Sequence, residues 1–406
     1  MKNSQFKIST LFVGAFLLFT AFFPVRSVSA QVAIKGETIY SMSGAPIKNG
    51  VVLTNNGKIT AVGPASSIAI PSGYKVVTAK VVTPGLIDAH TVVGLAGYLN
   101  QPHDQMQIEG SSPIQPELRA IDAYNAREEL IGWIRSLGVT TIHTGHAPAA
   151  LISGQTMIAK TTGNTVDDAT LVQTAMISAT IGDRSMESGG KSPGTSAKQA
   201  AMLREILIKA QSYGTKKDSP RDLKLEMLKK VIDREIPLLV TVHRARDIMT
   251  ALRIAKEFNI KLVLDGVSEA QLVMDEIKAS GFPVIVHPTM YRAGGETESL
   301  SMENATKLMQ AGVTVALQSG YETYVPKTRV VLFEAALTLP NGMGFTEALA
   351  AITIDAAKIL GLEKRIGTIE VGKDADIAMY DGDPFEYTTH CTGTMINGKI
   401  VSEIVR

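Results

Sequence analysis

The stretch Val82-Thr83-Pro84-Gly85-Leu86-Ile87-Asp88-Ala89-His90-Thr91-Val92 decides how the rest of the chain is interpreted. It is an apolar run that is interrupted by Pro-Gly, resumes, and ends on a carboxylate and an imidazole. A buried strand that ends on polar side chains is typical of a barrel strand that delivers groups to an active site. We therefore expect an α/β barrel with its functional residues at the carboxyl ends of the strands.

The middle of the chain, residues 81–361, alternates apolar strand-like runs with amphipathic helical patterns. This alternation predicts parallel strands, and the number of units favours closure into a (β/α)8 TIM-like barrel. One region differs, because residues 156–160 and 169–177 both have strand patterns but the link between them is too short for a parallel crossover. We expect an inserted hairpin there, followed by a mobile surface loop over residues 182–196, which are rich in Gly and Ser.

The two ends of the chain share a different pattern, with short strand-like segments separated by turns. In the N-terminal part, Asn55-Asn56-Gly57 between two apolar runs indicates a hairpin. Residues 31–80 and 362–406 are therefore predicted to meet and form one small β-sandwich subdomain beside the barrel. Its carboxylates at Asp374 and Asp376 are expected to be turn and edge residues.

Residues 1–30 have the pattern of a signal peptide. Lys2 and Lys7 precede an apolar run, and Val28-Ser29-Ala30 has the small residues of a cleavage site. The apolar run is short for a membrane span, so we expect export to the periplasm or the medium after cleavage near Ala30. Contact with a membrane is expected only through this segment if it is not cleaved.

The composition excludes several classes of site and partner. Apolar residues make up 45% of the 406 residues and charged residues only 19%, which argues against disorder. Removal of residues 1–30, which carry three basic and no acidic side chains, lowers the net charge from +1 to −2, which argues against nucleic acid as a partner. Cys391 is the only cysteine, so the chain has no internal disulfide and no cysteine-based zinc site.

The segment from Pro84 to Val92 resembles the first metal-binding strand of the amidohydrolase superfamily, which reads P-G-x-(I/V/F)-D-x-H-x-H. Further phrases at residues 116–123, 154–156 and 243–248 resemble its imidazolonepropionase-like branch and the related secreted dipeptidase-like and cyclic-amide hydrolases. The resemblance covers nearly all of the chain after residue 30. It implies a barrel enzyme in which a bound divalent metal lowers the pKa of a water molecule and an aspartate removes the proton of that water.

Carried over residue by residue, the resemblance assigns His90 and His243 as metal ligands. Three other positions depart from the pattern: Val92 replaces the second histidine, Asp265 replaces a histidine before glycine, and Gly320 replaces the aspartate. Valine and glycine cannot coordinate a metal, so we expect the usual site to be incomplete.

A rearranged site is one alternative. His90, His243 and Asp265 form a two-histidine, one-carboxylate set that binds Zn, Fe or Mn when the three side chains converge. Lys160 would join them if it were the carboxylated lysine of two-metal relatives. Glu322 lies two positions after Gly320, so strand alternation would place its side chain on the same side as position 320. There it would act as a catalytic base together with Asp265. In the other alternative, Asp265 is a buried carboxylate that hydrogen-bonds to His243 or to an arginine.

Histidines at four predicted strand ends, His90, His143, His243 and His287, are difficult to explain as core residues alone. We expect His287, Arg244 and Tyr321 to contact a small-molecule substrate. The predicted function is hydrolysis of a carbon–nitrogen bond in a cyclic amide or dipeptide-like compound.

The alternative function is that of a metal-free pseudoenzyme, a binding scaffold or partner of an intact paralogue, in a homo- or hetero-oligomer with a related barrel. A serine nucleophile at Ser319 has little support, because no G-x-S-x-G elbow surrounds it.

Overall fold

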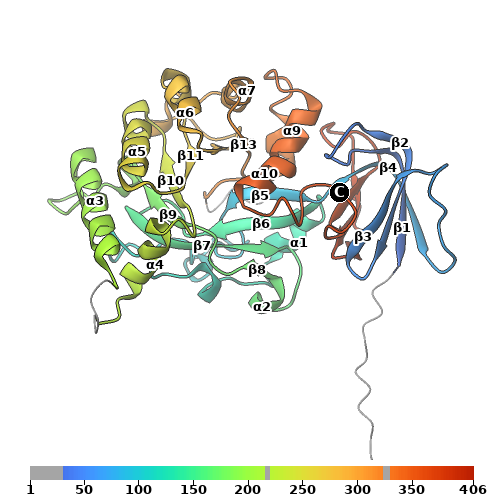
Figure 1. Ribbon diagram of the computed structural model, residues 1–406, viewed down its shortest axis with the longest axis horizontal. Helices are drawn as coiled ribbons and strands as arrows, with labels where there is room; N and C mark the ends of the chain where they lie inside the picture. Colours follow the sequence, from blue (N-terminus) through green and yellow to red (C-terminus); the bar gives the residue numbers. More distant parts are fainter. Residues whose placement is uncertain (1–30, 215–219, 323–329) are drawn as a thin grey trace, which may run out of the picture.

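The computed structural model describes residues 31–214, 220–322 and 330–406. The predicted signal peptide, residues 1–30, lies outside the described residues. In the described part of the chain, no helix has both the length and the apolar character needed to cross a membrane. Figure 1 shows the sheet formed by the two ends of the chain, in blue and red, beside the larger α/β body.

Strands from both ends of the chain form one sheet. In the described residues it has seven strands in the order β16-β15-β14-β4-β1-β2-β3. The join is made where β14 runs antiparallel to β4, with Tyr380 opposite Val81. The strands are β1 Val32–Ile39, β2 Ile47–Asn55, β3 Lys58–Pro64, β4 Lys75–Pro84, β14 Ile377–Tyr380, β15 Cys391–Ile396 and β16 Lys399–Ser402.

The hairpin predicted at Asn56-Gly57 is confirmed. It joins β2 to β3, and both turn residues have positive φ, at 50° for Asn56 and 79° for Gly57. Such angles suit Asn-Gly, whose twist matches that of the flanking strands. The meeting of the two ends in one sheet agrees with the sequence pattern, while the sandwich form and the domain boundaries stay predictions.

The second sheet forms a nearly closed barrel. Its strand order is β13-β12-β11-β10-β9-β7-β6-β5, with β8 paired to β7. The two ends of this path meet, because the backbone N–H of Ala89 donates to Leu317 (3.3 Å) and that of Gly320 donates to His90 (3.2 Å). The strands are β5 Leu86–Thr91, β6 Val139–Gly145, β7 Ile152–Lys160, β8 Thr170–Val172, β9 Ile177–Thr180, β10 Leu238–Val242, β11 Leu262–Gly266, β12 Val284–Val286 and β13 Val315–Ala316.

One barrel strand runs backwards, which corrects the expectation of strictly parallel strands. Strand β7 is antiparallel to both of its barrel neighbours, β6 and β9. The link from Gly145 to Ile152 is too short for a crossover helix, so the chain can only turn back on itself. The hairpin expected in this region is confirmed as the antiparallel pair of β7 and β8.

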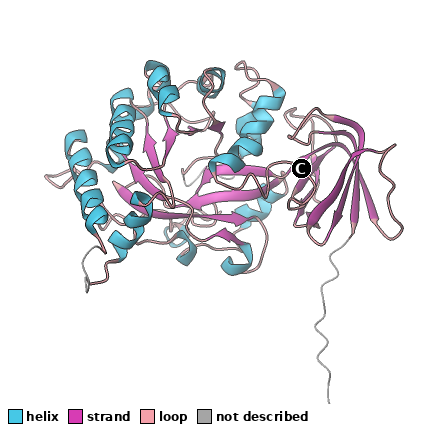
Figure 2. Cartoon of the chain, viewed as in Figure 1, coloured by secondary structure: helices cyan, strands magenta, loops and turns pink. Residues whose placement is uncertain are grey.

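Helices lie around the outside of the barrel sheet (Figures 1 and 2). Helix α5 shows why: its buried positions, including Ile248, Leu252 and Ala255, recur at helical spacing and pack into the main core. The described helices are α1 Glu129–Arg135, α2 Val166–Ala169, α3 Ser196–Ser212, α4 Leu223–Ile232, α5 Ala245–Phe258, α6 Met274–Ser280, α7 Asn304–Gln310, α8 Val331–Ala336, α9 Phe345–Ala351 and α10 Ile354–Ile359.

Candidate active site at the barrel mouth

A buried carboxylate–imidazole pair lies between two barrel strands. His90 on β5 places its Nδ1 3.2 Å from Oδ1 of Asp265 on β11, and neither side chain is exposed. Asp265 also accepts hydrogen bonds from Thr241 Oγ1 (2.6 Å) and from Gln318 Nε2 (2.6 Å). Burial alone would raise the pKa of Asp265, but His90 and these hydrogen bonds together hold it below its usual value. Asp265 is therefore ionised at neutral pH.

His243 follows β10 and faces the same space. Its Nδ1 lies 2.8 Å from Ser268 Oγ, and its Nε2 lies 3.3 Å from the hydroxyl of Tyr321. Burial lowers the pKa of His243 to about 3, so the ring is neutral at physiological pH. Gly266 permits this position, because a Cβ there would lie 2.6 Å from His243 Cε1. The glycine after Asp265 thus has a packing reason.

Asp88 is a second buried carboxylate, and Ser319 donates hydrogen bonds to it. It accepts hydrogen bonds from the backbone N–H of Ser319 (3.0 Å) and from the Ser319 hydroxyl. Burial raises the pKa of Asp88 to about 6 in spite of these hydrogen bonds. Asp88 is not among the site residues predicted from the sequence. The Ser319 hydroxyl donates to a carboxylate and is not hydrogen-bonded to a histidine, which gives no support to a serine nucleophile.

Two other predicted histidines have structural partners. His143 Nδ1 lies 2.7 Å from the carbonyl oxygen of Ala89, and its Nε2 lies 2.6 Å from Thr156 Oγ1. Burial lowers its pKa to about 3. His287 follows β12, and its Nδ1 donates to the carbonyl oxygen of Pro288 (2.8 Å). His287 is close enough to His243 for its charge to lower the pKa of that ring further.

An arginine that the sequence did not single out lies over the mouth. The Arg184 guanidinium carbon is 5.2 Å from the Tyr321 ring centroid and 5.9 Å from that of Tyr291. Its Nε is 3.5 Å from Glu296, and a terminal nitrogen donates to the Tyr291 hydroxyl. Arg184 comes from residues 182–196, which the composition marked only as a surface loop. No local sequence signal points to it.

The other predicted residues lie around this cluster. Tyr321 is buried with its hydroxyl at His243, whereas Arg244 lies at the rim and pairs with Asp183 at 2.8 Å. The charge of Glu322 contributes to keeping the pKa of Arg184 above its usual value. Glu322 therefore lies near the arginine, at the end of a described range.

Lys160 is corrected as a site residue. Because β7 runs backwards, Lys160 lies opposite Thr141, near the start of β6 and away from the mouth. Its Nζ pairs with Asp374 (2.7 Å) and Asp376 (3.0 Å), all three side chains being buried. The two aspartates, expected as turn or edge residues, instead join the sheet subdomain to the barrel.

The residues at the mouth do not fit a divalent metal. Val92 is buried in an apolar cluster with Ala96, Ala147 and Tyr321. Gly320 has φ of +89°, which an aspartate at this position could adopt only with strain. Within residues 31–214, 220–322 and 330–406, no group of three or more His, Cys, Asp or Glu side chains could hold a metal ion. His90, His243 and Asp265 share the mouth, but protein donors already occupy both oxygens of Asp265.

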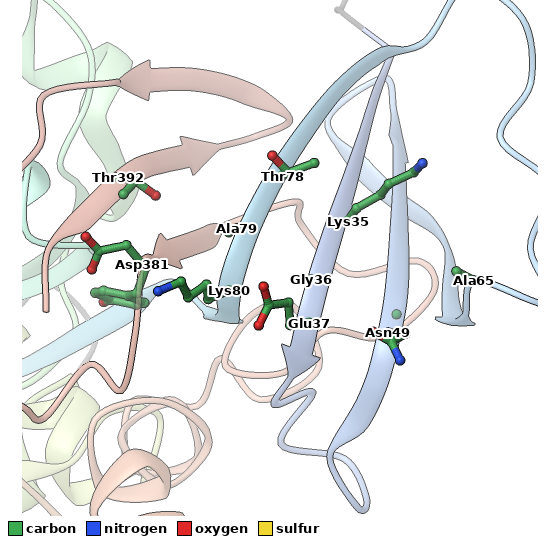
Figure 3. Close-up of a pocket in the computed structure, with 12 residues that line it drawn as sticks. Lys35, Gly36, Glu37, Asn49, Ala65, Thr78, Ala79, Lys80, Asp381 and Thr392 are labelled. Atoms are coloured by element: carbon green, nitrogen blue, oxygen red, sulfur yellow. The ribbon is translucent and has the colours of Figure 1, made fainter.

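A separate cavity of about 510 Å³ lies on the sheet subdomain (Figure 3). It is lined by β1 and β4 residues that include Lys35, Glu37 and Lys80, and the Lys80 side chain points toward Asp381. None of the strand-end histidines lines it, so it is not part of the mouth.

Comparisons with known proteins agree with this architecture. Residues 93–402 match the amidohydrolase family. An imidazolonepropionase of Brucella anthropi is 22% identical over 404 residues, covering 87% of this chain and 91% of that protein. An imidazolonepropionase of a Geobacillus species is 36% identical over 105 residues, covering 24% of this chain and 25% of that protein.

Solved structures show the same fold. A crystal structure of an amidohydrolase from Thermotoga maritima superposes with a TM-score of 0.84 at 28% identity, covering 92% of this chain and 100% of that chain. A zinc-bound adenosine deaminase from Xanthomonas campestris gives a TM-score of 0.55 at 16% identity, covering 91% and 92%, and its likeness concerns the fold alone.

Proposed function

Because this chain belongs to the amidohydrolase family, we propose that it hydrolyses a carbon–nitrogen bond other than an ordinary peptide bond, in a cyclic amide or dipeptide-like small molecule. The observation that carries the proposal is the pair formed by His90 and Asp265 at the carboxyl end of the barrel strands, where enzymes of this fold place their chemistry. Relatives named imidazolonepropionase support the same class of reaction.

In this proposal the chain's own side chains move the proton. Ionised Asp265 holds Nδ1 of His90, while Nε2 of His90 makes no hydrogen bond to any residue that the structure describes. That nitrogen takes a proton from the attacking water and returns it to the leaving nitrogen as the carbon–nitrogen bond breaks. The Tyr321 hydroxyl is the donor for the developing oxyanion, with Glu322 as a second acid–base group.

Access to this pair requires a side-chain movement. His90 and His243 are buried, and the rings of Tyr321 and Tyr291 lie 5.9 Å and 6.4 Å from them, centroid to centroid. His287 and Arg244, the remaining proposed substrate contacts, flank the same entrance. Since His90, Tyr291 and Tyr321 are all buried, the proposal requires these tyrosine rings to move before a substrate can reach His90.

A divalent metal is general in this family, and Zn, Fe or Mn would supply a water molecule of lowered pKa. The donor set of this chain does not match that requirement, so no step is assigned to a metal. The combination of His90, His243 and Asp265 as a rearranged metal site is tested by the metal content of the purified protein.

The second candidate function is a metal-free binding scaffold, acting alone or as the partner of an intact paralogue. It is favoured by one observation: Thr241 and Gln318 each donate a hydrogen bond to one of the two Asp265 oxygens. The carboxylate is therefore already bound by side chains of the barrel. A scaffold of this kind would bind small molecules at the mouth without turning them over.

One experiment separates the two functions. Protein purified without chelator is analysed for metal and assayed against cyclic amides and dipeptides, with and without added Zn, Mn or Fe. Hydrolysis that is lost in His90→Ala and kept in His390→Ala, a variant of a half-exposed histidine on the sheet subdomain, supports the hydrolase. A complete absence of hydrolysis under every metal condition supports the scaffold.

Export is proposed from the N-terminal pattern alone. Cleavage near Ala30 predicts that the protein recovered from the periplasm or medium begins at Gln31. N-terminal sequencing of the recovered protein tests this, and a chain that still begins at Met1 would contradict it.

A further inference from the structure

A polar cavity of about 570 Å³ lies at the junction between the barrel and the sheet subdomain. It is lined by α1, by residues 162–164 after β7 and by Val401 of β16. We propose that this cavity binds a tetrahedral oxyanion, the phosphate or sulfate group of a small molecule, through the guanidinium groups of Arg127 and Arg135. The loop leaves β7 at the end of the barrel opposite His90, so the inference does not depend on the proposed hydrolysis.

The first argument is a guanidinium without a counter-charge. Arg135 is partly buried and forms no ion pair with any residue that the structure describes, and its Nε is buried without a hydrogen-bond acceptor. Burial lowers the pKa of Arg135, and no nearby carboxylate opposes that change. Removal of a cation from water without an anionic partner costs free energy. An anion in the adjoining cavity would supply the missing partner.

The second argument is the fixed orientation of two arginines. Arg135 Nη1 donates to the carbonyl oxygen of Thr161 at 2.7 Å, and Arg127 Nε donates to that of Asn164 at 3.1 Å. Both guanidinium groups are thereby held against the same loop. Nη2 of Arg135 and both terminal nitrogens of Arg127 donate to no described residue. Several planar N–H donors from two cations match the oxygens of a phosphate or sulfate group.

The third argument is the backbone of the loop. Thr162, Gly163 and Asn164 all line the cavity, and none of their three consecutive N–H groups donates to a described residue. Gly163 has φ of +106°, which other residues adopt only with strain. Successive backbone N–H groups in a turn form a concave surface that binds anions. The loop therefore adds neutral donors to the two cations.

Two glutamates also line the cavity, but neither pairs with these arginines. Glu128 Oε1 accepts the backbone N–H groups of Tyr98 (2.7 Å) and Leu130 (3.3 Å), so it is held at the start of α1. Glu129 is exposed and forms no ion pair within the described part of the chain. The guanidinium groups therefore remain available to a bound anion.

The test measures binding of inorganic phosphate and of sulfate to the full chain by calorimetry. Acetate and chloride at equal ionic strength are the controls. We expect phosphate or sulfate to bind with a Kd of about 1 mM or tighter, and both controls to bind at least ten times more weakly. The tighter of the two oxyanions identifies the group that the cavity accepts. If neither binds more tightly than acetate and chloride, the proposal is wrong.

Two variants locate the binding groups. Arg135→Gln removes the uncompensated cation, and Gly132→Leu fills the cavity while both arginines stay. Outside the backbone of α1, a Cβ at Gly132 would lie near one atom only, Arg135 Nη2 at 3.7 Å, so the larger side chain can extend into the cavity. Each variant should weaken oxyanion binding at least tenfold.

The matched control is Arg204→Gln, which removes an arginine that pairs with Glu257 on the outer surface and should bind as the parent does. Melting temperatures measured without phosphate or sulfate show whether each variant is folded. Calorimetry is required because both anions also stabilise proteins in general by their exclusion from the surface. Parental binding by a folded Arg135→Gln or Gly132→Leu variant would refute the assignment.

Discussion

Nδ1 of His90 lies 3.2 Å from Oδ1 of Asp265, and both side chains are completely buried. They come from strands that are not neighbours in the barrel sheet, whose order separates β5 from β11. The pair therefore spans the inside of the barrel, and its geometry depends on closure of the sheet. Such a buried carboxylate–imidazole contact is costly to break, since removal of His90 leaves the buried Asp265 carboxylate with one partner fewer.

Replacement of Asp265 by Asn should reduce hydrolysis. An amide cannot fix the ring of His90 as a carboxylate does, so we expect kcat to fall by about 10²-fold or more, in the range of a lost acid–base group. The exposed variant Asp275→Asn on α6 is the matched control. A kcat within twofold of the parent in Asp265→Asn would show that His90 does not act through this pair.

Replacement of Gln318 by Glu should create a metal-responsive protein. Gln318 Nε2 lies 2.6 Å from Asp265 Oδ1, so a glutamate there would place two carboxylates side by side near His90. Without metal, we expect destabilisation from like-charge repulsion, and addition of Zn²⁺ should raise the melting temperature. The parent should show no such rise. If Zn²⁺ also raised the melting temperature of the parent, the conclusion that its side chains do not fit a divalent metal would be wrong.

The stability of the protein should fall with acid in a window set partly by His143. The pKa of His143 is about 3 in the folded protein and 6.5 without burial, as in the unfolded chain. Between these two pH values the unfolded chain therefore binds one more proton than the folded protein. Stability is therefore lost as pH falls from 6.5 toward 3, by about 1.4 kcal/mol per pH unit for this group. His143→Gln should flatten the slope by about that amount in urea unfolding between pH 6 and pH 5, below the unfolded pKa.

The comparison with the variant is needed because Asp88 acts in the opposite direction. Its folded pKa of about 6 lies above the ordinary 3.8, so it favours folding more as pH falls from 6 toward 3.8. The parent's total slope thus mixes both signs. An unchanged slope in His143→Gln would mean that the ring is already protonated in the folded protein.

Lys160 should matter for stability and Lys58 should not. Both contact Asp374, but Lys160 is buried and also pairs with Asp376, whereas the Lys58 side chain is 49% exposed. Lys160→Met leaves buried carboxylates uncompensated and should cost about 3–5 kcal/mol. Lys58→Ala should cost less than about 1 kcal/mol. Equal costs in denaturant unfolding would contradict the assignment of Lys160 to the junction between barrel and sheet.

Much of the framework could be predicted from local patterns. The Pro84–Val92 stretch indicated a barrel strand ending on His90, and the Asn56-Gly57 turn indicated a hairpin. The short link between the strand-like runs 156–160 and 169–177 indicated an antiparallel hairpin. His90, His243 and Asp265 were each predicted at strand ends, and the structure brings all three to the mouth. These features depend on side-chain alternation and turn chemistry, which act over a few residues.

Only the tertiary structure decided the rest. The reversal of β7 moved Lys160 to the opposite end of the barrel, into an ion cluster with residues more than 200 positions away. Arg184 lies at the mouth although no local sequence pattern points to it. Thr241 and Gln318 hydrogen-bond to Asp265 from other strands of the barrel. Strand direction and contacts between distant residues arise from closure of the whole sheet. The sequence by itself therefore determined the family and the strand ends, while long-range packing decided which side chains could meet there.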